Sequence, residues 1–137
     1  MGQQQLLLII LGAVIVGVAV AVAIVMFQDN AITKNKEAMT NDLLQLAVKA
    51  QNYYYRPIAM GGGSHSFVGL TADAAGLLKI ASTNFTDNAN GKYSISVAGD
   101  ANQVVFMGIG NVELDDGSYS TLTLLVKPEG QVLTIVN

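Results

Sequence analysis

Residues 6–27 read LLLIILGAVIVGVAVAVAIVMF, a run of 22 residues in which no side chain is polar. Only Gly12 and Gly17 in this run fall outside the hydrophobic class. At a rise of ~1.5 Å per residue, a helix of this length covers roughly 33 Å, which matches the hydrocarbon thickness of a bilayer. The run therefore predicts a helix that is buried by lipid or by other protein subunits.

A cleaved secretory signal peptide is an alternative explanation for this apolar run. Ala19-Val20-Ala21 and Ala21-Val22-Ala23 both have the small-x-small pattern of a cleavage site. A signal peptide also needs a basic segment before its apolar run, and Met1 to Gln5 contains neither Lys nor Arg. We therefore expect the run to remain in the mature protein.

Small residues recur on one face of the predicted apolar helix. Ala13, Gly17 and Ala21 are spaced four residues apart. This spacing lets the backbones of two helices approach closely where no hydrophobic effect drives their association. Gly and Ala are also common in apolar helices in general. Both a helix-packing face and an incidental pattern therefore fit these three residues.

The segment after Phe27 extends the helix and makes it amphipathic. No Gly or Pro occurs between Gln28 and Arg56, and Pro57 ends the helix because proline disfavours a helical conformation in the residue before it. The apolar positions have helical spacing: Ile32, Met39, Leu43, Leu46, Ala47, Ala50 and Tyr54. One helix over about residues 3–55 is ~80 Å long, with its weakest point at Asp29-Asn30. The residues that follow are too few to cover it.

Residues 57–137 predict a short helix and a small antiparallel sheet. A flexible loop, Gly61-Gly62-Gly63-Ser64, precedes a short helix over 71–81 that Thr71 caps. Four strand-like runs follow: Tyr93–Ala98, Gln103–Gly108, Leu122–Lys127 and Gln131–Val136. A longer connection over 110–118 separates the second and third strands, and the short turns elsewhere favour a four-stranded antiparallel meander.

The predicted fold class is therefore α+β. One long helix packs the apolar stripe of its second half on the sheet. The sequence divides into an apolar helix half over 1–28, an amphipathic helix half over 29–56, and a globular domain over 57–137.

Composition excludes several classes of function. The chain has a net charge of −3 and no Cys, and residues 57–137 are acidic without any basic stripe, which argues against a nucleic-acid partner. The absence of Cys excludes disulfides and thiolate catalysis. His65, the only histidine, lies beside Ser64 but lacks a third orienting group. We therefore expect no enzyme activity and no cofactor.

Three further motifs have ordinary structural explanations. Asp87-Asn88-Ala89-Asn90-Gly91 has no acidic residue at the last position of a calcium loop, so a turn before a strand is expected there. Asp115-Asp116-Gly117 predicts an exposed acidic turn rather than a metal site. Asn84-Phe85-Thr86 is the only N-x-S/T triplet and makes Asn84 a possible glycosylation site.

This order of elements resembles type IV pilins and pseudopilins. In that family the apolar helices bundle in the core of a filament, and the sheet domains coat the outside. The resemblance implies a single-pass subunit in the inner membrane before assembly and an extracellular surface filament afterwards. Its implied partners are copies of itself and a pilus-type assembly machinery. The family usually carries Glu at the fifth mature residue, where this chain has Gln5 or, counted from Gln3, Leu7.

Gln3, Gln4 and Gln5 lie at or close to the place of that carboxylate. Each amide can donate and accept hydrogen bonds without the desolvation cost of a buried charge. One hypothesis is that they form hydrogen bonds between neighbouring helix starts and satisfy free terminal N–H groups. The alternative is that they lie at the polar surface of the membrane.

The sequence predicts a structural subunit of an extracellular type IV pilus-like filament that polymerises through its apolar N-terminal helix. Two alternatives share the same features. One is a pseudopilin of a secretion system, and the other is a monomeric single-pass binding domain anchored in the membrane.

Overall fold

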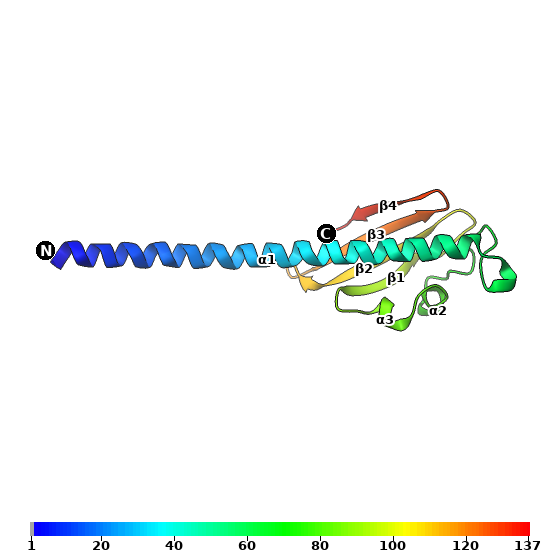
Figure 1. Ribbon diagram of the computed structural model, residues 1–137, viewed down its shortest axis with the longest axis horizontal. Helices are drawn as coiled ribbons and strands as arrows, with labels where there is room; N and C mark the ends of the chain where they lie inside the picture. Colours follow the sequence, from blue (N-terminus) through cyan, green and yellow to red (C-terminus); the bar gives the residue numbers. More distant parts are fainter. Residues whose placement is uncertain (1) are drawn as a thin grey trace.

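The computed structural model describes residues 2–137, and its dominant element is one helix that extends far beyond the rest of the chain (Figure 1). This helix, α1, comprises Gly2–Tyr55 and continues without a break through Asp29-Asn30. Asp and Asn lower helix propensity by only ~0.7 kcal/mol per residue relative to Ala, which is too little to interrupt a long helix. Its end at Tyr55, just before Pro57, agrees with the sequence prediction.

Four strands form one antiparallel sheet in the order β1-β2-β3-β4, which confirms the predicted meander and the α+β class. The strands are β1 Gly91–Val97, β2 Val104–Glu113, β3 Tyr119–Lys127 and β4 Gly130–Ile135. The second half of α1 lies across one face of this sheet (Figure 1). We call the sheet, its connecting segments and the part of α1 packed on them the sheet domain.

The second strand is longer than the sequence predicts. The pattern places its end at Gly108, whereas β2 continues to Glu113. The two glycines that interrupt its apolar pattern lie under α1 and β1. A Cβ atom at Gly108 would lie 3.0 Å from the ring of Tyr93, and one at Gly110 would collide with Oδ1 of Asn35. These glycines therefore permit close packing within a continuing strand rather than marking its end.

Three short helical segments connect α1 to the sheet: η1 Ile58–Met60, α2 Ala74–Leu78 and α3 Thr83–Thr86. The N-cap of α2 is Asp73 and not Thr71, so the predicted cap is wrong. Thr71 donates its hydroxyl to the Asp73 carboxylate, which also accepts a 2.8 Å hydrogen bond from the Gly76 N–H. These two bonds lower the pKa of Asp73.

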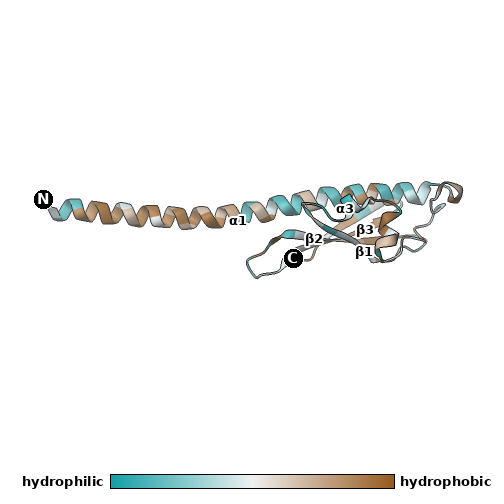
Figure 2. Ribbon diagram, turned by 90° about the horizontal axis from the view of Figure 1, so that it is seen from below, coloured by the Kyte–Doolittle hydropathy of each residue, from teal (hydrophilic) through white to brown (hydrophobic). Residues whose placement is uncertain are grey.

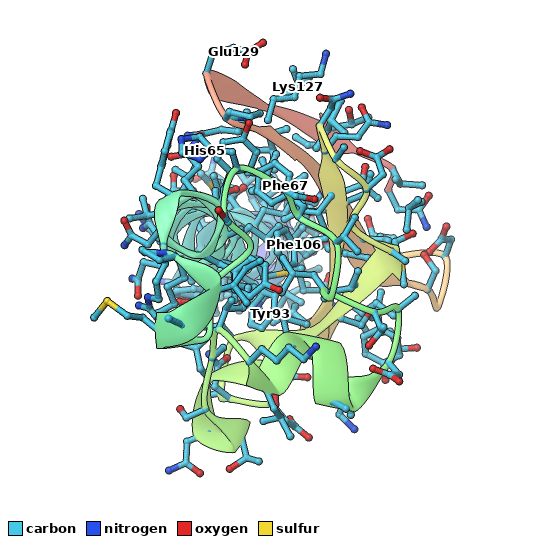
Figure 3. The ribbon with its side chains drawn as sticks, turned by 90° about the vertical axis from the view of Figure 1, so that its right-hand side faces the viewer. His65, Phe67, Tyr93, Phe106, Lys127 and Glu129 are labelled. Atoms are coloured by element: carbon cyan, nitrogen blue, oxygen red, sulfur yellow. The ribbon has the colours of Figure 1, made fainter. Side chains whose placement is uncertain are left out.

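The hydrophobic core lies between α1 and the inner face of the sheet, as the view along the helix shows (Figure 3). The predicted apolar stripe of α1 forms the helical side of this core, although Ile32 at its start and Tyr54 at its end are only partly buried. The first buried residue of α1 is Asn35. The completely buried side chains include Met39, Leu43, Leu46, Phe67, Leu70, Phe106, Leu122, Leu124 and Val126.

Candidate assembly surface

The first half of α1 exposes its apolar side chains on every side. Between Leu6 and Phe27, each large apolar side chain is 51–74% exposed. Figure 2 shows this apolar segment projecting beyond the sheet domain. By length and composition α1 can span a membrane, and none of its most apolar stretch is buried by the rest of the chain. Monomeric soluble proteins rarely expose apolar patches above roughly a few hundred Å², so lipid or other protein must cover this surface.

The small residues of this segment have no packing role within the chain. Ala13, Gly17 and Ala21 are all exposed, one helical turn after another along α1. A Cβ atom added at Gly17 would meet nothing within 4 Å. Gly17 therefore does not accommodate a neighbouring part of its own chain, and any close contact that it permits is with another molecule.

Gln3, Gln4 and Gln5 lie in the first turns of α1 and are exposed. The first four N–H groups of a helix lack partners within the helix itself. The three amide side chains are therefore close to donors that need acceptors. Their predicted contacts with neighbouring helices lie outside a single chain, and Met1 lies outside the described residues.

A buried polar cluster joins α1 to the start of β1, and sequence reasoning missed it. One carboxylate oxygen of Asp42 accepts three hydrogen bonds: from Asn88 Nδ2 at 3.0 Å, Asn90 Nδ2 at 2.9 Å and the Tyr93 hydroxyl at 2.7 Å. Two helical turns earlier on α1, Asn35 donates from Nδ2 to the Asn90 carbonyl at 2.7 Å. The turn over 87–91, which the sequence predicted as a plain turn, is thus fixed to the helix.

Burial shapes the electrostatics of this cluster. Asp42 is 9% exposed and Tyr93 is 5% exposed. Burial raises the pKa of Tyr93 first, and the hydrogen bond to the Asp42 carboxylate and its negative charge raise that pKa further. The phenol therefore stays neutral and acts as a donor. Among the described residues, the ion pairs are Lys34–Glu37 and Lys92–Asp87, so neutral donors hold the Asp42 carboxylate.

A signal for this cluster was present in the sequence. Asn35 and Asp42 follow the spacing of Met39 and Leu46 along one helix face, so the buried stripe includes two polar residues. A buried carboxylate needs hydrogen-bond donors. The Asn-rich turn before β1 contains several such donors, although it is distant in sequence.

The other candidate residues are separate from one another. The His65 ring packs edge-on against Tyr54 and Tyr55, with ring centroids 5.6 and 5.7 Å away. Asn84 is exposed in α3, a position open to modification. Asp116 lies in the β2–β3 turn and accepts hydrogen bonds from the N–H and hydroxyl of Ser118, which lower its pKa. The part of the chain that the structure describes contains no group of three His, Cys, Asp or Glu placed to hold a metal ion.

The fold as a whole is pilin-like. It combines a long N-terminal helix, apolar and unpartnered in its first half, with a four-stranded antiparallel sheet packed on the second half. Comparisons with protein-family models, curated proteins and solved structures found no significant match.

Proposed function

We propose that this chain is a structural subunit of an extracellular type IV pilus-like filament and polymerises through the apolar first half of α1. The observation that carries the proposal is the exposure of every large apolar side chain from Leu6 to Phe27, on a helix that projects beyond its own domain. A helix with apolar side chains all round needs an apolar environment on all sides. A bundle of such helices at the centre of a filament provides it.

The same surface serves two successive states in this proposal. Before assembly, roughly 33 Å of apolar helix matches the thickness of one bilayer, so the subunit waits as a single-pass protein of the inner membrane. During assembly, contacts between helices replace contacts with lipid tails. Lipid is as apolar as the side chains, so close backbone packing at Ala13, Gly17 and Ala21 supports association better than hydrophobicity alone.

The sheet domain fits the outside of such a filament. Residues 57–137 carry three Lys and seven carboxylates, which suits a solvated acidic surface. The polar cluster around Asp42 fixes the sheet to the helix, so that the position of each helix in the core determines the position of its sheet domain.

The test is recovery of the protein from the cell surface. We expect shearing of expressing cells to release filaments that contain this chain and are visible by negative-stain electron microscopy. A pseudopilin of a secretion system would give no long surface filaments at native expression. A monomeric membrane-anchored binding domain would remain in the membrane fraction after shearing and migrate as a monomer in detergent. Either of those results contradicts the proposal.

A further inference from the structure

The sheet domain has an exposed apolar loop at the end farthest from the apolar helix. This loop, residues 56–68, follows the C-terminal end of α1 and is called the distal loop here (Figure 1). Ile58, Met60 and Val68 in it are 74%, 71% and 61% exposed. Figure 3 looks onto this end of the molecule, where His65 and Phe67 mark the path of the loop.

The distal loop is held in one conformation by hydrogen bonds to the end of α1. Gly63 N–H donates to the Tyr53 carbonyl at 2.8 Å, His65 N–H to the Tyr54 carbonyl at 2.6 Å, and Ser64 N–H to the Arg56 carbonyl at 3.0 Å. A Cβ atom at Gly62 would collide with the backbone of Arg56, so the loop folds back tightly. Its apolar residues are therefore presented on a preorganised projection, which lowers the entropic cost of binding.

A hollow lies at the opposite end of the sheet domain. It has a volume of about 330 Å³ and separates α1 from the turn between β2 and β3. Its lining residues are Gln28, Ala31, Val112, Glu113, Leu114 and Asp115. Its lining is mixed polar and apolar; Val112 and Leu114 are its large apolar residues, and both remain partly exposed. We call it the hairpin hollow.

The distal loop and the segment beside the hairpin hollow have opposite charge. Residues 56–72, which include the distal loop, contain Arg56 and His65 and no carboxylate. The last residue of β2 and the turn after it, beside the hairpin hollow, contain Glu113, Asp115 and Asp116 and no cation. The ion pairs among the described residues are Lys34–Glu37 and Lys92–Asp87, so neither Arg56 nor these carboxylates is paired within the chain. The β3–β4 turn lies at the same end as the distal loop, because the Tyr55 hydroxyl donates a hydrogen bond to the Pro128 carbonyl, and in this turn Lys127 offsets Glu129. Asp100 also lies at this end, where its carbonyl accepts a hydrogen bond from the Phe67 N–H.

We infer that the distal loop of one subunit binds in the hairpin hollow of a second copy of the same chain. Met60 and Ile58 then contact Val112 and Leu114, and Arg56 faces the acidic turn. The two surfaces differ, so the contact is heterologous and repeats along an open helical assembly instead of closing a dimer. This inference rests on the proposed filament function and assigns the contact that its sheet domains make along the axis.

The geometry sets the spacing of the two subunits. The hollow is lined by Ala31 and the loop follows Tyr55, so the two surfaces lie 24 helical residues apart. At ~1.5 Å per residue, this separation is roughly 36 Å along α1. Subunits joined by the contact are therefore displaced by about that distance along the filament axis.

Cross-linking tests the contact directly, since the chain has no native Cys. We expect sheared filaments of the double variant Met60→Cys, Leu114→Cys to give a ladder of dimers, trimers and longer species after mild oxidation on a non-reducing gel. The single variants should stay monomeric on that gel. The matched control is Met60→Cys with Val132→Cys, because Val132 is 58% exposed on β4 and outside the hollow.

Every other result contradicts either the contact or the proposed function. Intact filaments that give no ladder with the Leu114 pair overturn the contact while leaving the filament function intact. Dimers from Met60→Cys alone, or a ladder with the Val132 pair instead, also overturn it. Absence of filaments from the unaltered chain contradicts the proposed function itself.

A charge exchange provides a second readout. We expect Arg56→Glu to lower the yield of sheared filaments about tenfold, since it places like charges across the contact. Combining it with Asp115→Arg should restore the yield. Lys92→Glu, an exposed charge reversal in β1 outside the lining of the hollow, is the control and should leave the yield near normal. Failure of the double variant to recover, with Arg56→Glu deficient, contradicts the assigned pairing.

Discussion

The hydroxyl of Tyr93 in β1 donates a 2.7 Å hydrogen bond to the carboxylate of Asp42 in α1, at a point where both residues are buried. The same carboxylate oxygen accepts hydrogen bonds from two asparagines of the turn before β1. Apolar packing is non-directional, so it specifies the position of a helix on a sheet less sharply than hydrogen bonds do. A buried carboxylate with three specific donors opposes such a shift, because a displaced Asp42 would lose all of them.

The sheet domain should fold without the apolar half of α1. A fragment beginning at Asp29 retains every buried residue of the helix, since the first of these is Asn35. We expect an acidic α+β monomer, measured by circular dichroism and by size-exclusion chromatography. A random-coil spectrum from this fragment would contradict an independently folding domain.

Removal of the Asp42 carboxylate should destabilise that fragment strongly. Asp42→Ala leaves the Tyr93 hydroxyl and two Asn amides without their acceptor in a buried site, and we expect a loss of ~2–4 kcal/mol in the free energy of unfolding. Asp42→Asn keeps one acceptor oxygen and should cost less. Urea unfolding measures both, with Gln45→Ala, an exposed position on the same helix, as the control. Equal stability of Asp42→Ala and the unaltered fragment would show that the cluster contributes nothing.

The same cluster predicts a dependence of stability on alkaline pH. The pKa of Tyr93 is raised in the folded protein above its ordinary value of 10.0. The unfolded chain therefore loses this proton first as the pH rises. Stability from this group is fully present below about pH 10 and declines above it, by up to ~1.4 kcal/mol per pH unit.

Tyr93→Phe isolates this effect. The variant should be less stable at neutral pH, because it lacks the bond to Asp42, but its stability should fall less steeply above pH 10. Tyr119→Phe, at an exposed position in β3, is the matched control. Unfolding midpoints measured from pH 8 to 11 compare the three proteins, and parallel curves for all of them would refute the role of Tyr93.

The sequence predicts much of the fold because its strongest signals are local. The apolar run, the helical spacing after it and Pro57 together define α1 to within a residue or two. Alternation of apolar and polar residues identifies four strands in their observed order. The length of β2 is missed because Gly108 and Gly110 serve contacts with Tyr93 and Asn35, which are distant in sequence.

The polar cluster is missed for a related physical reason. The donors to Asp42 lie 46, 48 and 51 residues away along the chain, and no local pattern connects them. The hairpin hollow likewise depends on how the β2–β3 turn sits beside α1. The proposed packing residues Ala13, Gly17 and Ala21 remain predictions, since their partners belong to other chains.

Gly17→Leu should abolish filaments and leave membrane insertion intact. The added side chain meets nothing within its own chain at Cβ and raises the hydrophobicity of the segment, so insertion is preserved. Between closely packed helices, the same side chain forces the backbones apart. Electron microscopy of the sheared fraction and membrane fractionation measure the two outcomes separately. Val18→Leu, on a neighbouring face, is the control, and normal filaments from Gly17→Leu would refute the small-residue contact.

The glutamines at the start of α1 should act together. If Gln3, Gln4 and Gln5 form hydrogen bonds between neighbouring helix starts, each can partly replace another, and single Gln→Ala changes should reduce filament yield only slightly. Replacing all three with Leu removes every side-chain acceptor near the terminal N–H groups and should prevent assembly, because buried unpaired donors cost ~1–3 kcal/mol each.

A triple change to Asn is the matched control for this experiment, because it keeps three amides while shortening the side chains. Assembly yields of the single, triple-Leu and triple-Asn variants, each normalised to the subunit in the membrane, separate a hydrogen-bonding role from a position at the membrane surface. If the glutamines only lie at the membrane surface and take no part in assembly, the triple-Leu variant should insert and still polymerise. Full-length filaments from that variant would therefore leave the hydrogen-bonding hypothesis without support. If the triple-Asn variant forms filaments and the triple-Leu variant does not, assembly requires amides at the helix starts.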